Sequence, residues 1–229
     1  MIAFLREGAD VAINYFPTEE PDAEDLAKLA KNDGSKLVLI PGDITEQDFC
    51  NELVETAAGE LGGLDILVNN AAYQQSKKSI DEITPEQFDR TVKTNLYAMF
   101  WITKAALGYM KSGAAIFNTA SVNSFNPGEE LLDYATTKGG IAIFTKGLAK
   151  QTGQEGNSPE RRRARSGLDA APGRGRPTPR QARQFGQDTP LGRAGQPAEL
   201  GPIYVALASN DLSFTHGSGF GANGGTGIV

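Results

Sequence analysis

Short apolar runs alternate with longer stretches of mixed polarity along most of this chain of 229 residues. The short runs are rich in leucine, isoleucine and valine, which is typical of buried strands, and the longer stretches repeat apolar residues at helical spacing. Strands are expected at residues 10–15, 36–40, 64–68 and 114–120, and helices at residues 19–31, 45–60, 84–102, 132–150 and 197–208. Repeated strand–helix units predict an α/β fold, a doubly wound parallel sheet that forms a single domain over residues 1–229.

The alternation breaks off at about residues 153–183. Leu168 is the only large aliphatic side chain in this block, which is rich in glycine, proline and arginine, and no strand pattern is found in it. Such a composition buries too little apolar surface to fold, so we expect residues 153–183 to be irregular or disordered. The run at residues 161–165 could instead form an anion-binding patch. The arginines of the block are Arg161, Arg162, Arg163, Arg165, Arg174, Arg176, Arg180 and Arg183.

Composition and charge exclude several classes of function. The chain is 39% hydrophobic and 22% charged, and its formal net charge of −6 argues against a nucleic-acid-binding protein, which needs a concentrated basic face. A single Cys50 excludes an intrachain disulfide, and His216 without clustered cysteines offers no metal site. No apolar run approaches the ~18 residues of a membrane span, and charges interrupt the stretch where a signal peptide would stand. We therefore expect a cytoplasmic protein with no metal, membrane or nucleic-acid partner.

Candidate chemistry centres on Tyr134 and Lys138, which stand four positions apart near the start of an expected helix. This spacing puts a phenol and an ammonium on one face of a helix, and a nearby cation favours the phenolate, so the tyrosine can exchange a proton closer to neutrality. Such pairs also arise by chance, and both side chains could simply lie on a helix surface. The pair gains weight from Ser121, which follows an expected strand and precedes Tyr134 by thirteen residues.

A serine, tyrosine and lysine at these offsets resemble the short-chain dehydrogenase/reductase family, which has a Rossmann-like doubly wound fold. Other segments are similar to the same family: residues 42–44, 64–72, 94–96, 189–193 and 196–200. Two more segments, residues 14–17 and 185–190, resemble the branch that contains glucose dehydrogenase-like enzymes and NADP-linked aldehyde reductases. The resemblance covers the chain except for the arginine-rich block.

This resemblance implies an NAD(P)-dependent oxidoreductase that interconverts an alcohol and a carbonyl by hydride transfer. Tyr134 would be the general acid/base, Lys138 would assist it and hold the nicotinamide ribose, and Ser121 would hydrogen-bond the reacting oxygen. Asn95 would hold a water that links the lysine to solvent. The residues implied to bind the cofactor are Asn14, Tyr15, Asp43, Ile44, Asn70, Ala71, Ala72, Tyr134 and Lys138.

Some of these residues keep a second interpretation. Asn95 could be a polar side chain satisfied within its helix, and Asp43 could serve only as a turn former at the end of a strand. Asn14 and Tyr15 end the expected strand at residues 10–15, and the absence there of the acidic residue typical of strict NAD binders favours NADP over NAD. The resemblance also implies a small-molecule alcohol, aldehyde or sugar as substrate, and a homo-oligomer, either a tetramer or a dimer.

The family's first strand and the glycine-rich turn that follows it are missing from this sequence. The glycines of that turn let backbone N–H groups approach the cofactor pyrophosphate. A Gly-x-Gly-x-x-Gly pattern at residues 219–224 is rejected as a substitute, because no helix follows it. The missing strand would be central, so its loss would expose strand edges in the middle of the fold. Two alternatives therefore stay open: a catalytically inactive fragment of such an enzyme, and a non-catalytic binding protein that relies on the arginine-rich block.

Overall fold

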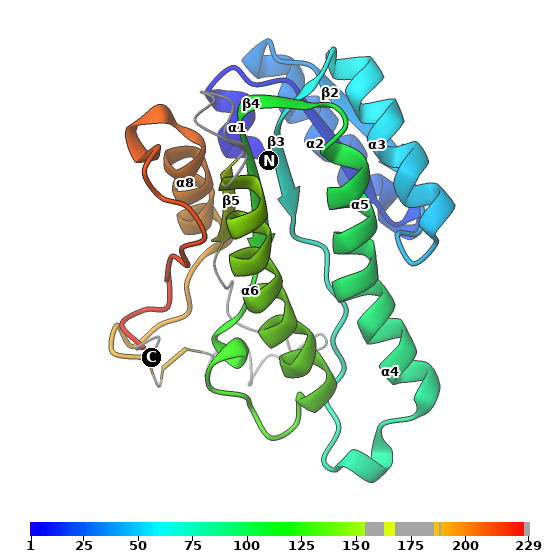
Figure 1. Cartoon of the computed structure of the whole chain (residues 1–229), viewed down its shortest axis with the longest axis vertical. Helices are drawn as coiled ribbons and strands as arrows, with labels where there is room; N and C mark the ends of the chain where they lie inside the picture. Colours follow the sequence, from blue (N-terminus) through cyan, green and yellow to red (C-terminus); the bar gives the residue numbers. More distant parts are fainter. Residues whose placement is uncertain (154–162, 168–185, 188, 227–229) are drawn as a thin grey trace.

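The computed structural model describes residues 1–153, 163–167, 186–187 and 189–226. In this part of the chain β1 (Val11–Tyr15) pairs with β2 (Leu37–Pro41), whereas β3 (Leu64–Asn69) pairs with β4 (Met110–Thr119), which also pairs with β5 (Arg163–Gly167). Every pair is parallel, and helices lie on both sides of the strands (Figure 1). The α/β class and the parallel strands expected from the sequence are confirmed.

Seven α-helices are found in the described residues: α1 (Ile2–Arg6), α2 (Glu20–Asp33), α3 (Gln47–Leu61), α4 (Pro85–Val92), α5 (Ala98–Ala106), α6 (Leu132–Gly153) and α8 (Pro197–Ala208). Short 3-10 turns connect some of them: η1 (Pro17–Glu19), η2 (Ile80–Glu82), η4 (Val122–Ser124) and η5 (Asn210–Leu212). Between α4 and α5 the chain stays helical through η3 (Lys93–Tyr97), which is a π-helical segment. The single long helix expected at residues 84–102 is therefore present, but its winding changes in the middle.

Local sequence explains where this long helix begins. The Thr84 hydroxyl accepts a hydrogen bond from the backbone N–H of Gln87 (3.2 Å), which satisfies one of the free donors of the first turn. Pro85 follows at the first helical position, where its missing N–H has no partner to lose. Near the N-terminus, Gly8 follows α1, and its φ of +80° lets the chain turn from α1 toward β1.

Strand β4 lies at the centre of the core. Its residues from Ala114 to Thr119 are buried, and successive side chains point to opposite faces. Ala114 and Ile116 pack with residues of α3, α5 and α6, whereas Ala115 and Phe117 pack with Leu207 of α8. Figure 1 shows α8 on one side of β3 and β4 and α5 on the other. Because both faces of β4 are covered, its sequence reads as a continuous apolar run.

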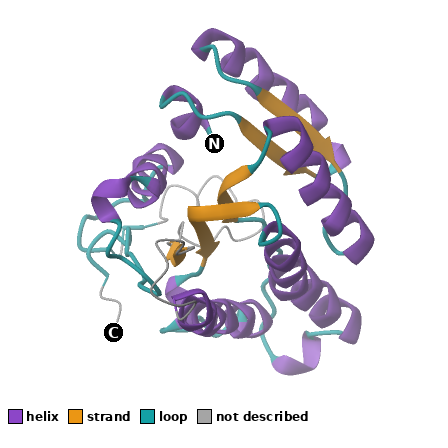
Figure 2. Ribbon diagram, turned by 45° about the horizontal axis from the view of Figure 1, so that its top comes forward, coloured by secondary structure: helices purple, strands orange, loops and turns teal. Residues whose placement is uncertain are grey.

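The strands form two groups rather than one sheet (Figure 2). Among the described residues no ladder joins β1 to β3, although α3 and α5 pack against both groups and Ile102 of α5 belongs to both apolar clusters. All five residues of β1 are partly exposed. Within the described part of the chain, one edge of β1 therefore has no partner strand, as expected if a central strand is missing.

The arginine-rich block corrects one sequence-based expectation. Residues 163–167 form β5, which pairs in register with β4 from Ala115 opposite Arg163 to Thr119 opposite Gly167. A strand needs only backbone hydrogen bonds to a neighbour, so a sequence without any strand pattern can still pair where an edge is offered. The rest of the block, at residues 154–162 and 168–183, lies outside the described residues. No helix in the described part of the chain is both long enough and apolar enough to cross a membrane.

We predict that Phe117→Ala lowers the free energy of unfolding by about 3–5 kcal/mol, because it leaves a cavity in a fully buried site. The Phe117 ring meets the Tyr204 ring edge-on at a centroid distance of 5.9 Å, and this contact would also be lost. Urea denaturation followed by circular dichroism measures the change. Phe214→Ala is the matched control, because the Phe214 side chain is fully exposed and its loss should leave stability unchanged. Equal effects of the two substitutions would contradict the proposed core.

Candidate active site

Polar side chains meet where β3 and β4 end. Asn69 lies opposite Asn118 in the ladder, and the Asn69 amide donates a hydrogen bond to the Asn118 side-chain oxygen (2.8 Å). One residue further along each strand, the Thr119 hydroxyl donates to the Asn70 side-chain oxygen (3.1 Å). The carboxyl ends of parallel strands are where open α/β sheets bind ligands. These bonds therefore fix the two strand ends together at the expected edge.

Ser121 follows this edge directly. It begins η4, and its Oγ accepts hydrogen bonds from the backbone N–H (3.1 Å) and the side-chain amide (3.3 Å) of Asn123. Its side chain is 3% exposed. The hydroxyl is thus held in place by the turn that leaves β4.

The first turns of α6 place Tyr134 and Lys138 beside each other, as their spacing predicts. The Lys138 Nζ lies 5.5 Å from the centre of the Tyr134 ring, and it donates a hydrogen bond to the backbone carbonyl of Thr119 (2.6 Å). Both residues are buried. A cation this close to a phenol stabilises the phenolate form, and the bond to Thr119 ties the pair to the end of β4.

Asn95 reaches the same region from the π-helical segment η3. Its side chain accepts a hydrogen bond from the backbone N–H of Tyr73 (2.7 Å) and donates to the Tyr73 carbonyl (2.9 Å) and to the Thr137 hydroxyl (2.9 Å). Thr137 lies on α6 between Tyr134 and Lys138, and its hydroxyl bonds the Tyr134 carbonyl (2.7 Å). The structure therefore brings Asn95, Tyr134 and Lys138 into one connected group, with Ser121 at the end of the neighbouring strand.

Known proteins are similar to this chain in sequence and in fold. A family model described as enoyl-(acyl carrier protein) reductase matches residues 2–227. An uncharacterized oxidoreductase of Bacillus subtilis, YhxD, is 45% identical over 236 residues, covering 98% of this chain and 76% of the relative. The chloroplastic NADPH-dependent aldehyde reductase 1 of Arabidopsis thaliana is 36% identical over 225 residues, covering 92% of this chain and 74% of that protein. A solved structure from Brucella melitensis, a short-chain dehydrogenase/reductase titled glucose/ribitol dehydrogenase, has a TM-score of 0.81 at 26% identity and covers 99% of this chain and 89% of that chain.

The chain belongs to the short-chain dehydrogenase/reductase family. The sequence-based expectation of an NAD(P)-dependent oxidoreductase with a Rossmann-like fold is confirmed at the level of the family.

The residues expected to bind the adenine half of a dinucleotide in this dehydrogenase lie at the ends of β1 and β2. The Asn14 side-chain amide donates to the carbonyls of Ile40 (3.0 Å) and Gly42 (3.2 Å), so it links the two strand ends. Asp43 accepts a hydrogen bond from the backbone N–H of Thr45 (2.9 Å), which is the turn-forming role considered for it. Ile44 packs in the core beneath this turn. Tyr15 ends β1 next to them and is partly exposed.

The residues present fit the nicotinamide half of the cofactor. Lys138 bonds the end of β4, Ser121 follows that strand end, and Asn70, Ala71 and Ala72 at the end of the neighbouring β3 are exposed. An exposed strand end next to buried polar groups is the setting in which a flat polar ring can be held. Among the described residues, no three metal-ligating side chains come together.

Several residues of this group were not foreseen from the sequence. Thr119 and Thr137 bond Lys138 and Asn95 respectively, and Tyr73 supplies both backbone groups that hold Asn95. Threonines near a strand end or inside a helix are common, and only the tertiary contacts distinguish these two. No local pattern could have selected them.

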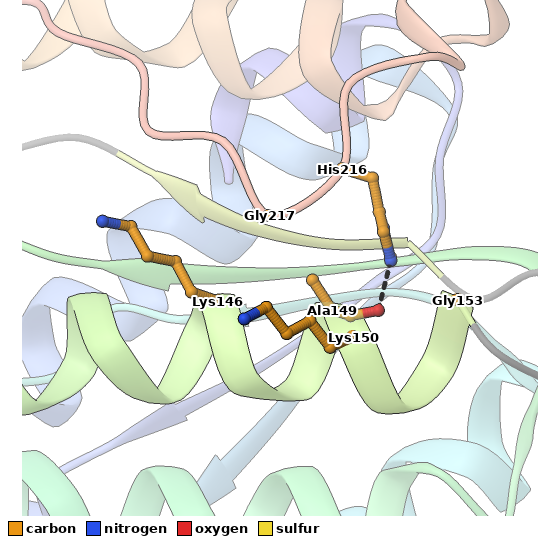
Figure 3. Close-up of a pocket in the computed structure, with 6 residues that line it drawn as sticks. All are labelled: Lys146, Ala149, Lys150, Gly153, His216 and Gly217. Carbon is orange, nitrogen blue, oxygen red and sulfur yellow. Dashed lines mark hydrogen bonds between the residues drawn. The ribbon is translucent and has the colours of Figure 1, made fainter.

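A separate hollow of about 480 Å³ lies at the other end of α6 (Figure 3). His216 points into it and donates from Nε2 to the Ala149 carbonyl (2.6 Å), and Lys146 and Lys150 flank it. Fifteen residues separate Tyr134 from Ala149, which is about 22 Å along a helix. This hollow is therefore remote from the candidate active site, and His216 acts there as a hydrogen-bond donor to the end of α6.

Cys50 is predicted to resist thiol reagents in the folded dehydrogenase. Its side chain is fully buried and donates to the Ile44 carbonyl (3.2 Å). Burial, reinforced by the carboxylates of Asp43 and Glu46, raises the pKa of the Cys50 thiol to about 12. The thiolate is the reactive form, so at a pH of about 8.5, where a free cysteine is half ionised, the native thiol stays protonated.

A disulfide reagent should therefore label the denatured chain fully while the native chain reacts only as fast as it unfolds. The sign of the pH effect follows, because the unfolded chain loses this proton first and stability should fall as the pH rises above about 8.5. Rapid stoichiometric labelling of native protein would contradict the buried position of Cys50.

Proposed function

We propose that this protein reversibly reduces a small-molecule carbonyl compound to an alcohol, with Tyr134 as the general acid/base. The Tyr134 hydroxyl passes a proton to or from the substrate oxygen, and Lys138 favours the phenolate. Ser121 donates a hydrogen bond from Oγ to the same oxygen, where negative charge builds up. The nicotinamide cofactor, when bound, supplies or accepts the hydride.

One observation carries this proposal: the Lys138 Nζ lies 5.5 Å from the centre of the buried Tyr134 ring at the end of β4. A lysine and a tyrosine on a helix surface would both point to water, where the cation is screened and has little influence on the phenol. Here both are at most 5% exposed, so their interaction is only weakly screened. Burial of this pair favours the catalytic interpretation over the surface interpretation.

For Asn95 we propose a supporting role in proton transfer. Its two bonds to Tyr73 and its bond to Thr137 hold a side-chain amide within the group that carries the lysine. In this position it can orient a water between Lys138 and solvent.

NADP is the preferred cofactor in this proposal. Asn14 and Tyr15 put no carboxylate at the end of β1, where a strict NAD enzyme would bind the ribose hydroxyl with an acidic residue. The Arabidopsis relative is an NADPH-dependent enzyme by name. Asn14, Tyr15, Asp43, Ile44, Asn70, Ala71 and Ala72 remain the proposed cofactor contacts beside Tyr134 and Lys138.

The names of the relatives support an aldehyde or a sugar as the substrate class. We further propose that the protein is cytoplasmic and forms a homodimer or homotetramer. Large apolar side chains are exposed on the long helices that carry the candidate site, and a second copy would cover them. These side chains are Phe88, Tyr97, Phe100, Leu132 and Ile143.

The second candidate function is that of a catalytically inactive relative, a chain that does not convert substrate. It is favoured by the division of the strands into two groups. The proposed adenine contacts lie at β1 and the proposed nicotinamide contacts at β3, and among the described residues no ladder joins these two strands. The first experiment measures whether the chain binds NADPH. The purified chain is added to NADPH and the change in NADPH fluorescence is followed. Binding with turnover supports the first candidate, and absence of both supports the second. A non-catalytic binding protein based on residues 161–165 would show neither, but would bind an anionic partner.

We predict that Tyr134→Phe lowers kcat by about 10²–10⁴-fold, because it removes the proton that the substrate oxygen needs. NADPH consumption is followed with a panel of aldehydes and sugars. Tyr109→Phe is the matched control, since Tyr109 is partly exposed just before β4 and should keep full activity. If Tyr134→Phe retained wild-type kcat while the protein bound NADPH, the proposed role of Tyr134 would be wrong.

A further inference from the structure

The residue before Tyr134 is a carboxylate that the proposed reaction does not use. Asp133 is 1% exposed, and its two oxygens accept three hydrogen bonds. One oxygen accepts from the Gln87 side-chain amide (3.1 Å) and from the Thr91 hydroxyl (2.8 Å), and the other from the backbone N–H of Tyr134 (2.8 Å). Gln87 and Thr91 are themselves buried on α4.

A buried carboxylate is costly unless donors surround it. Here no salt bridge of the described residues includes Asp133, and the donors are a neutral amide, a hydroxyl and a backbone N–H. An apolar residue at this position would pack α4 against α6 without that cost. The charged network instead fixes one geometry, because each of its bonds has a preferred direction and length.

A second polar connection joins the same pair of helical segments. Asp133 joins Thr91, and four residues further along each segment Thr137 joins Asn95 (2.9 Å). Four residues are about one helical turn, so the two connections stack one above the other. Tyr134 lies between them on α6, next to Asp133 and bonded through its carbonyl to Thr137 (2.7 Å).

A close contact between the α6 backbone and a side chain of η3 continues this alignment. The α-carbon of Gly140 lies so near Leu96 that an added Cβ would stand 3.2 Å from the leucine Cδ2. Helices that approach this closely at one end transmit a shift at the other end, because packed interiors have little free volume. The position of Tyr134 relative to Asn95 thus depends on what holds α4 to α6 at Asp133.

From these contacts we infer that Asp133 is a positioning residue, which together with Gln87 and Thr91 sets the placement of Tyr134 relative to Asn95. The inference rests on the proposed function, because only in that reaction does this placement matter for rate. Asp133 does not touch the substrate or cofactor. Its contribution is to hold a near-attack arrangement that the tyrosine and asparagine cannot hold alone.

The test compares Asp133→Asn with the double variant Asp133→Asn plus Gln87→Glu. In the single variant the introduced amide has one acceptor oxygen in place of two, so at least one of the three donors that Asp133 accepts from loses its acceptor. The double variant supplies a carboxylate at position 87 that can accept from the introduced amide, with donor and acceptor exchanged, and it keeps the net charge. Leu148→Ala is the control for lost stability, because Leu148 is buried in the second half of α6, away from Tyr134.

The expected result is a fall in kcat of about tenfold or more for Asp133→Asn with KM little changed, since misplacement by about 1 Å can cost about 10² in rate. The double variant should recover most of the rate, and Leu148→Ala should keep it. A single variant with wild-type kcat, or one that the exchange does not rescue, overturns the inference.

A second measurement does not need turnover. Nuclear Overhauser contacts between the Asn95 side-chain amide and Thr137 report the alignment directly. They should weaken in Asp133→Asn, return in the double variant and persist in Leu148→Ala. If the chain shows no turnover, the proposed function fails and these contacts still decide on Asp133. Unchanged contacts in Asp133→Asn would overturn the inference in either case.

Discussion

Parallel pairing of β3 with β4 is the interaction on which the rest of the molecule depends. It sets Asn69 of β3 opposite Asn118 of β4. Beyond this pair β3 leads to Asn70 and β4 leads to Ser121. A shift of one residue would turn every side chain of one strand to the other face. Asn118 would then lose both its amide contact to Asn69 and its bond to Thr145 of α6 (2.9 Å). The buried amide pair makes such a shift unfavourable, because it would leave polar groups without partners.

The contact between α6 and the α4–η3–α5 helix is unusually polar for a buried one. Apolar packing tolerates small sliding movements, since many arrangements bury the same area. Directed bonds at Asp133 and Thr137 allow fewer arrangements, and the absence of a side chain at Gly140 leaves room for the Leu96 side chain beside them. The structure thus gives up some apolar burial at the place where atomic placement matters most to the proposed chemistry.

Much of the fold could be predicted from the sequence, because its apolar runs coincide with the strands β1 to β4. The run before Ser121 became β4, and Thr84 and Pro85 mark the start of the long helix. Residues 163–167 could not be predicted as a strand, because no feature of their own sequence indicates one. They form a strand because the edge of β4 offers backbone groups to pair with. The Tyr134–Lys138 pair follows from spacing alone. Asp133, Thr119 and Thr137 acquire their roles from residues far away in the chain, which no local pattern reveals.

The π-helical segment η3 has a consequence for how this site can change. Its backbone N–H of Ala98 donates to the carbonyl of Lys93, five residues earlier, so one turn holds an additional residue. Removing any single residue from that turn would restore ordinary winding, and the flanking helices would keep about their present relative rotation because the wider turn takes up the additional residue. Asn95 lies inside the turn, so its side chain would change direction and lose its present bonds to Tyr73 and Thr137. Length, as well as residue identity, is therefore constrained in this turn, and a one-residue deletion there would be far more damaging than a substitution at most of its positions.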